Sequence, residues 1–396
     1  MRILVLDTHY QEALNQVYTA TPEFESQSSD KQLKLIYNSG FGRADSLTVN
    51  LRNAGCEAAQ FVVNALPVQL RWARENGLSD VGPMPESKLR HLWRRAEWRF
   101  GLRTNTPGIN VAEWEMEIVR AQVRSFGPEV IFICDVLYYP ARFHLELKQM
   151  ARLLVGEMAY PIPPGLEIKP FDLIVSAAPH YVTRIREAGV NSELLRLGFE
   201  ESILEHLDPT SRDTEVAFVG SVGKSHTQRL ELLEELSRRV PLSIWGTGAD
   251  SLRADSPLRA KMHGSLWGYD MYRQLQRSKI ALNIHIDMAE KFAANMRLYE
   301  ATGVGTMLVT DWKQNLGDLF EDRKEVVAYR SIDECADLIT YYLEHDEERE
   351  AIARAGQRRT LGDHTYRQRM HELVEILDSY LRLSSESDRR VSGNSA

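Results

Sequence analysis

The stretch Ala281-Leu-Asn-Ile-His-Ile-Asp287 decides the fold, because a run of apolar and β-branched residues stops here in polar ones. A strand covered by helices on both faces of its sheet shows no polar alternation, so the run predicts a buried parallel strand over residues 280–286. Ligands of open parallel sheets bind at the carboxyl ends of the strands. The residues after this strand are therefore expected to face a ligand crevice.

A second stretch, Asn295-Met-Arg-Leu-Tyr-Glu300-Ala-Thr-Gly-Val-Gly305, has the spacing of one short helix. Arg297 and Glu300 fall on neighbouring turns of it. An open helix N-terminus offers unpaired N–H groups and a partial positive charge, which suit a phosphate. We assign a diphosphate to Arg297 with the backbone of Asn295 and Met296. Glu300, one turn deeper, is placed to bind a neutral polyhydroxyl group such as a ribose.

These residues and the motifs that follow them resemble a known family. The motifs are Asn295-x-Arg297-x-x-Glu300-Ala-x-Gly303, Leu308-Val-Thr-Asp311, Val326-Val-x-Tyr329 and His364-Thr-Tyr366-x-x-Arg369. Together they resemble the C-terminal half of a CgeB-type, spore-maturation-protein-like glycosyltransferase, whose C-terminal domain is of the glycosyl transferases group 1 type. The resemblance implies the α/β fold called GT-B, in which two Rossmann-like, doubly wound parallel-sheet domains face a central cleft.

The resemblance also implies an activity. It implies a hexosyltransferase-like enzyme of polysaccharide biosynthesis that moves a sugar from a nucleotide diphosphate sugar to a hydroxyl acceptor, which is a glycan, a lipid-linked saccharide or a protein. Many retaining GT-B enzymes carry a second glutamate upstream of the one that matches Glu300. This chain has Phe292 at that position, which is a departure from the family pattern. Glu290 is a candidate substitute for the missing donor-sugar contact.

The length and the linkers predict the domain organisation. A chain of 396 residues exceeds the about 250 to 300 at which a single core stops growing, so two domains are expected. The polar, proline-bearing stretch Leu207-Asp-Pro-Thr-Ser-Arg-Asp213 reads as a linker between them. With these bounds the resemblance implies an acceptor-binding domain over 1–207, a donor domain over 214–365 and a helix over 366–383 that crosses back. The polar residues 384–396 are predicted to form a disordered tail.

The composition excludes several classes of protein. A formal net charge of −8 argues against nonspecific nucleic-acid binding. Three widely spaced cysteines, Cys56, Cys134 and Cys335, form neither a disulfide framework nor a zinc motif. No apolar run approaches the about 20 residues that cross a bilayer. We therefore expect a cytoplasmic protein in a reducing compartment.

Residues 88–103 carry basic and aromatic side chains in alternation. In a single helix such a pattern suits an anionic membrane surface or a lipid-linked acceptor, which predicts a peripheral contact at the inner face of the membrane. The alternative is a solvated helix whose tryptophans pack inward.

Two polar residues of the N-terminal half follow apolar strands, namely Asp135 after Val130-Ile-Phe-Ile-Cys134 and His180 after Phe171-Asp-Leu-Ile-Val-Ser176. A histidine titrates near neutrality, and a carboxylate in a suitable site can also take a proton from an acceptor hydroxyl. Both are candidates for acid or base catalysis, beside Arg297 and Glu300. The alternative is that Asp135 caps a turn and His180 bonds a backbone carbonyl.

The donor half shows a strand, a Gly/Ser loop and a helix between Glu215 and Leu236, and glycines in such a loop let the backbone approach a phosphate. The spacing matches neither a Walker A loop nor the full dinucleotide fingerprint, so an ordinary turn is the alternative. Aromatic residues after the next strand are candidates to stack on a nucleobase, with packing in the core as the alternative. The donor-binding candidates of this half, beyond the helix described above, are Gly220, Ser221, Lys224, His226, Arg229, Trp245, His263, Trp267 and His285.

We expect no metal ion and no cofactor other than the nucleotide diphosphate sugar itself. His285 and Asp287 are too few to hold a metal, and basic side chains can neutralise a leaving diphosphate instead. Two other functions stay open. A nucleotide-sugar epimerase of similar fold also needs a diphosphate cradle, and a noncatalytic GT-B-like binding protein needs only the packing.

Overall fold

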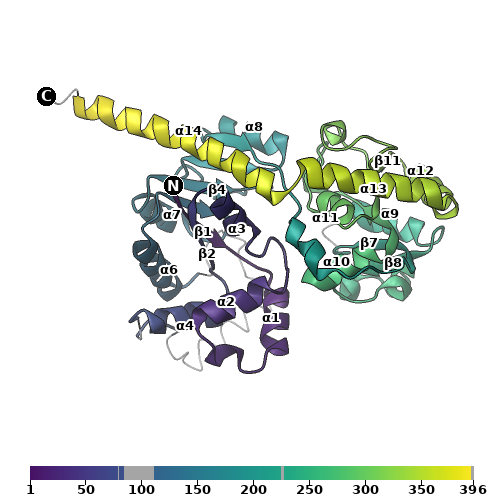
Figure 1. Cartoon of the computed structure of the whole chain (residues 1–396), viewed down its shortest axis with the longest axis horizontal. Coiled ribbons are helices and arrows are strands. Elements are labelled where there is room, and N and C mark those ends of the chain that lie inside the picture. The colour runs from purple at the N-terminus through teal and green to yellow at the C-terminus, as the bar shows by residue number, and fades with distance from the viewer. Residues whose placement is uncertain (79, 84–110, 224–226, 394–396) are drawn as a thin grey trace.

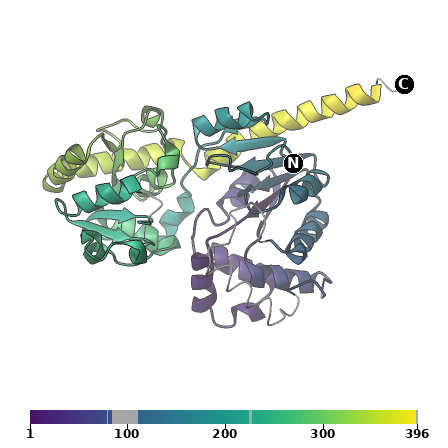
Figure 2. The same ribbon diagram turned by 180° about the vertical axis from the view of Figure 1, so that it is seen from behind.

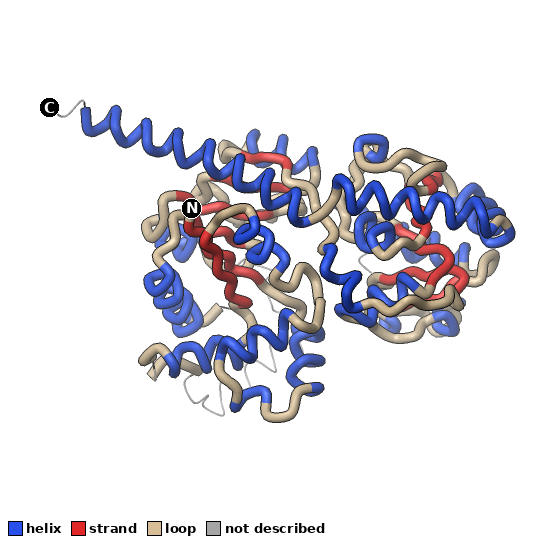
Figure 3. The backbone as a smooth tube through the Cα atoms, in the orientation of Figure 1, coloured by secondary structure: helices blue, strands red, loops and turns tan. Residues whose placement is uncertain are grey.

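The computed structural model describes residues 1–78, 80–83, 111–223 and 227–393, and these form two α/β domains side by side (Figure 1). Each domain holds one parallel sheet between layers of helices, as the tube in Figure 3 shows with strands in red and helices in blue. Two parallel doubly wound sheets are what the alternating strand and helix pattern predicted.

The strands of the first sheet run in the order β2-β1-β3-β4-β5-β6, all parallel. The strand order of the second sheet is β11-β10-β9-β7-β8, again all parallel. The strands are β1 (Arg2–Asp7), β2 (Glu57–Val62), β3 (Val130–Ile133), β4 (Leu153–Glu157), β5 (Leu173–Ser176), β6 (Ser192–Leu194), β7 (Thr214–Val219), β8 (Leu242–Trp245), β9 (Ser278–Asn283), β10 (Met307–Asp311) and β11 (Val327–Tyr329).

Helices cover both faces of each sheet, and alternate strand residues point to opposite layers. In β1, Leu4 and Leu6 join one apolar cluster while Ile3 and Val5 join another. The helices of the first domain are α1 (Gln11–Ala20), α2 (Ser29–Tyr37), α3 (Ser46–Asn53), α4 (Leu66–Glu75), α6 (Glu113–Phe126), α7 (Ala141–Lys148) and α8 (Pro179–Glu187). Those that follow are α9 (Thr227–Leu236), α10 (Gly268–Gln276), α11 (Arg297–Gly303), α12 (Ile332–Glu344), α13 (Asp346–Asp363) and α14 (Tyr366–Gly393).

Strand β9 starts and ends earlier than the predicted range 280–286. Its ladder with β10 stops at the pair Asn283 and Thr310. Two residues later the N–H of His285 donates to a side chain, Asp311 Oδ1 at 3.0 Å, instead of a strand carbonyl. The polar end of the run is therefore a loop, and Asn283 is the last strand residue.

Helix α14 returns to the first domain and lies across it in both views (Figures 1 and 2). It packs an apolar stripe against the cluster that contains Ile3 and Val5 of β1. The stripe consists of Tyr366, Met370, Leu373, Leu377 and Leu381. The helix continues past Leu383 to Gly393, whereas the sequence predicts a disordered tail from residue 384. No glycine or proline interrupts the sequence between these two residues, so nothing in the backbone stops the helix there.

His144 on α7 makes the stability of the first domain depend on pH. Its ring is buried beside Phe171, and neither ring nitrogen has a hydrogen-bond partner among the described residues. Burial lowers its pKa from 6.5 to about 4, so between these values the unfolded chain binds a proton that the folded chain does not. The free energy of unfolding should fall as the pH drops from 6.5 to 4, by up to roughly 3 kcal/mol from this group.

Chemical denaturation of His144→Leu at several pH values tests this prediction. The variant should lose part of the decline in unfolding free energy below pH 6.5. The same change at the exposed His371 is the control and should keep the wild-type slope. Equal slopes for all three proteins would contradict the prediction.

Candidate functional site

A cavity of about 790 Å³ lies between the carboxyl ends of the two sheets. Its walls come from both domains, namely from residues after β1 and β4 on one side and from residues after β7, β8 and β9 on the other. Carboxyl ends of parallel strands are where this architecture binds ligands. Nine of the predicted donor-site residues line it, which are Gly220, Ser221, Arg229, Trp245, Trp267, Asn295, Met296, Arg297 and Glu300.

Arg297 and Glu300 form an ion pair at the start of α11. Arg297 Nη1 lies 2.9 Å from Glu300 Oε2, and the two side chains are 14% and 7% exposed. Arg297 Nη2 also donates to the carbonyl of Val219, the last residue of β7, at 3.2 Å. The guanidinium is thereby held at the end of β7 and faces the same cavity as the β7 loop. Helix α11 has only seven residues, so side chains rather than its dipole carry most of the charge here.

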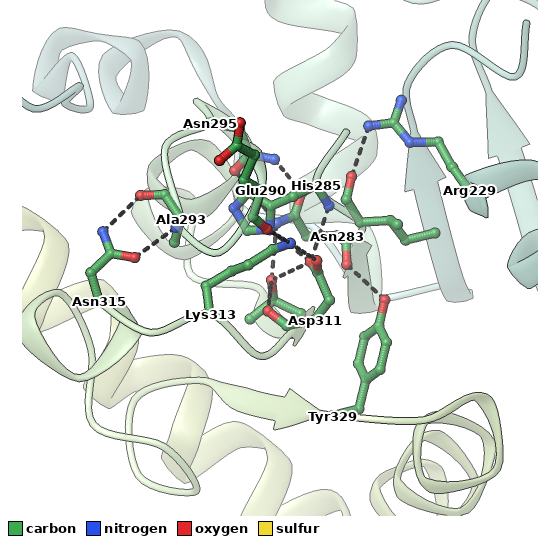
Figure 4. A network of polar contacts seen from close by, with 12 residues as sticks. Arg229, Asn283, His285, Glu290, Ala293, Asn295, Asp311, Lys313, Asn315 and Tyr329 are labelled. Atoms are coloured by element: carbon green, nitrogen blue, oxygen red, sulfur yellow. Dashed lines mark hydrogen bonds and ion pairs between the residues drawn. The ribbon is translucent and has the colours of Figure 1, made fainter. Parts of the chain in front are cut away.

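Arg229 on α9 is a buried cation beside the cavity. Its Nη1 donates to the carbonyl of Ser221 at 3.2 Å and its Nη2 to that of Ile284 at 2.8 Å, the second of which Figure 4 shows. Among the described residues no carboxylate lies within ion-pair distance of it, and Nε has no hydrogen-bond partner. Burial lowers the pKa of Arg229, because the charged form has lost its water. A buried cation of this kind favours an anionic ligand.

His285 does not line the cavity, and its side chain lies in a polar network (Figure 4). Its Nδ1 lies 2.6 Å from Asp311 Oδ1, and Lys313 Nζ lies 3.2 Å from Asp311 Oδ2. Burial opposes the ionisation of Asp311, yet these two neighbours hold its pKa below the usual value. The network fixes the loop after β9. On the cavity side Asn295 Nδ2 donates to Asn283 Oδ1 at 2.8 Å, which ties the start of α11 to the end of β9.

The aromatic candidates take different places. Trp245 lines the cavity and stacks on His263, with ring centroids 4.9 Å apart, whereas His263 does not line it. Trp267 reaches the other domain, where its ring centroid lies 5.4 Å from that of Phe41 and 5.9 Å from that of Tyr10. Trp267 therefore both lines the cavity and contacts the other domain. Lys224, His226 and the segment 88–103 lie outside the described residues.

Asp135 and His180 are not among the residues that line the cavity. Asp135 Oδ1 accepts the N–H of Leu137 at 3.0 Å, so it caps a turn, and burial raises its pKa. His180 Nε2 lies 3.3 Å from the carbonyl of Met288, and its ring stacks on Phe292 at 5.2 Å. Both follow the structural alternatives that the sequence left open.

The departure from the family pattern has a structural counterpart. Phe292, where a second glutamate was expected, is the ring that stacks on His180 of the first domain. Glu290 makes two bonds to Arg184 of α8, at 2.7 and 3.1 Å, and does not line the cavity. Both residues join the two domains, and neither lines the cavity.

Six residues of the first-domain wall were not among the predicted site residues. Asp7, His9, Phe41, Arg43, Glu157 and Tyr160 all line the cavity. Asp7 ends β1 and Glu157 ends β4, so the rule that singled out Asp135 and His180 also applied to them. Arg43 carried no such signal, because it follows the turn at Gly42 and not a strand.

Within the described residues no helix is both long and apolar enough to span a bilayer. No group of three or more His, Cys, Asp or Glu residues there has the geometry to hold a metal ion.

A family model described as glycosyl transferase-like matches residues 228–375. No curated protein sequence matches the chain. Among solved structures, sucrose-phosphate synthase from Thermosynechococcus elongatus superposes with a TM-score of 0.57 at 10% identity, covering 97% of this chain and 100% of the other. Anabaena HepE, solved with UDP and glucose, gives 0.58 at 12% identity over 96% of this chain and 100% of its own. AviGT4, a glycosyltransferase involved in avilamycin A biosynthesis, gives 0.53 at 15% identity and 98% of each chain. The chain has the GT-B fold.

Proposed function

We propose that this protein transfers a sugar from a nucleotide diphosphate sugar to a hydroxyl group of an acceptor. The observation that supports it most is the buried Arg229, which has no carboxylate partner among the described residues and lines the same cavity as Arg297. Two cations in one half-enclosed site suit a diphosphate. The Anabaena protein of the same fold was solved with UDP-glucose. The finer assignment to the CgeB type and to a hexosyl donor is part of this proposal.

The donor is proposed to lie on the second-domain wall. Arg229 and Arg297 hold the diphosphate, the carboxylate of Glu300 accepts from the ribose hydroxyls, and Trp245 lies on the nucleobase side. As the bond from the sugar to the diphosphate breaks, negative charge grows on the leaving oxygen, and the two guanidinium groups stabilise it. The arginines thereby supply the charge neutralisation that a metal ion gives elsewhere, so the proposal includes no metal.

The acceptor is proposed to lie on the first-domain wall, across the cavity. Binding both substrates between two rigid sheets fixes the acceptor oxygen near the sugar, which turns an encounter in solution into a reaction within one complex. The peripheral membrane contact through residues 88–103 and the cytoplasmic location stay predictions.

Incubation of the purified chain with UDP-, GDP-, ADP- and dTDP-sugars tests the function. We expect release of the nucleoside diphosphate with one of these donors, faster when saccharide acceptors are present, and a glycosylated product by mass spectrometry. A donor whose sugar is interconverted without release of nucleotide would support an epimerase. Binding without any reaction would support a noncatalytic protein.

A further inference from the structure

The two walls of the cavity differ in charge. On the second-domain wall the cations Arg229 and Arg297 face one carboxylate, Glu300. On the first-domain wall two carboxylates, Asp7 and Glu157, accompany one cation, Arg43. The donor diphosphate fits the first of these, as proposed above. The first-domain wall has more carboxylates than cations, so it must suit a ligand of different charge.

Arg297 is paired with Glu300, but the second-domain wall also holds Arg229, which has no carboxylate partner among the described residues. The only arginine on the described first-domain wall is paired. Arg43 Nη1 lies 2.6 Å from Glu157 Oε2, and these side chains are 16% and 15% exposed. The pair joins the loop before α3 to the end of β4, so it is held by two separate elements. In so buried a place the attraction is weakly screened, and an anionic ligand would have to displace the carboxylate of Glu157 to reach Arg43.

The other titratable groups of this wall do not favour an anion either. Asp7 is buried and accepts the N–H of Thr8 at 2.8 Å and the amide of Gln60 at 3.3 Å. His9 lies 3.9 Å from Asp7 through Nε2 and Oδ2. Burial lowers the pKa of His9, although Asp7 opposes this, so the imidazole is neutral at pH 7. The wall therefore carries one more negative than positive charge.

We propose that the first-domain wall binds a neutral polyhydroxyl acceptor and rejects acceptors that carry a carboxylate or phosphate, with the Arg43–Glu157 pair as the determinant. Carboxylate and guanidinium groups both hydrogen-bond to hydroxyls, and the rings of Phe41 and Tyr160 offer apolar faces to a sugar. This inference rests on the proposed function, because it names the class of acceptor for the same cavity.

A matched pair of probes tests the inference, namely methyl glucoside and methyl glucuronide, which differ in one carboxylate. Their affinities are measured by ligand-observed NMR with the protein saturated with the nucleoside diphosphate that it binds among UDP, GDP, ADP and dTDP. The wild type should prefer the glucoside. Glu157→Gln keeps the size of the side chain and leaves Arg43 unpaired, so it should shift the ratio of affinities toward the glucuronide by about tenfold, or about 1.4 kcal/mol.

Arg43→Gln combined with Glu157→Gln is the matched control. It removes both charges and leaves Asp7, so the preference for the glucoside should return. The affinity for that nucleoside diphosphate, measured in every variant, reports on the fold and on the second-domain wall. If the wild type binds it but binds both probes equally, prefers the glucuronide or binds neither, the inference is overturned. An unchanged ratio in Glu157→Gln overturns it as well. Failure of the wild type to bind any nucleoside diphosphate instead overturns the proposed function.

Discussion

Replacing Arg297 by methionine should weaken the binding of the donor nucleotide about 100-fold, because a charge-assisted contact to a diphosphate is lost in a poorly hydrated site. Methionine preserves much of the length of the side chain, but it cannot donate the hydrogen bonds that the guanidinium gives to Met271 Sδ and to the carbonyl of Val219. Isothermal titration with the nucleoside diphosphate of the active donor measures the change. We expect the loss to appear in affinity, while the far-ultraviolet circular dichroism stays that of the wild type.

Two further variants separate a binding role from a structural one. Arg253→Met makes the same change on an exposed arginine of the same domain, which pairs with Asp255 at 2.9 Å, and should leave affinity unchanged. Arg297→Met leaves Glu300 buried without its partner, and this can cost stability. The double variant with Glu300→Gln removes both charges. Recovery of wild-type nucleotide affinity in the double variant would contradict a direct contact between Arg297 and the diphosphate.

Replacing Gly246 by alanine should destabilise the second domain by about 3 kcal/mol or more, since a new methyl group in a packed site must displace backbone. A Cβ at this position would lie 1.9 Å from the carbonyl oxygen of Gly220 and 2.6 Å from its carbon. The loops after β7 and β8 approach closely here, and the N–H of Gly220 donates to the carbonyl of Trp245 at 2.9 Å. Because both loops line the cavity, nucleotide affinity should fall as well.

Gly317 offers the matched control in the same domain. A Cβ there would meet nothing within 4 Å, and its φ is not positive, so Gly317→Ala should be close to neutral. Chemical denaturation of both variants gives the comparison. Equal unfolding free energies for Gly246→Ala and the wild type would show that the two loops can move apart without cost.

Sequence patterns brought together most of the residues that line the second-domain wall of the cavity, because the parts of this wall are local in the chain. Arg297 and Glu300 are three residues apart on one helix, and the loop with Gly220 and Ser221 follows directly after a strand. Spacing alone is sufficient to bring such residues together. The same patterns were not sufficient to predict the direction of the His285 side chain, because they do not tell which residues at a strand end face a ligand. In the structure its neighbours Ile284 and Ile286 line the cavity, and His285 turns to Asp311.

The sequence by itself determined that this chain forms two parallel α/β sheets, because runs of buried strand residues alternate with helical spacing and both signals are local. Only the tertiary structure decided which polar residues meet. Arg43 and Glu157 are 114 positions apart and pair because the loop before α3 and the end of β4 meet in the folded first domain. Asp135 and His180 also follow buried strands, but their side chains bond elsewhere. The side to which a strand-end residue turns depends on packing against segments far away in the chain, and local periodicity carries no information about those segments.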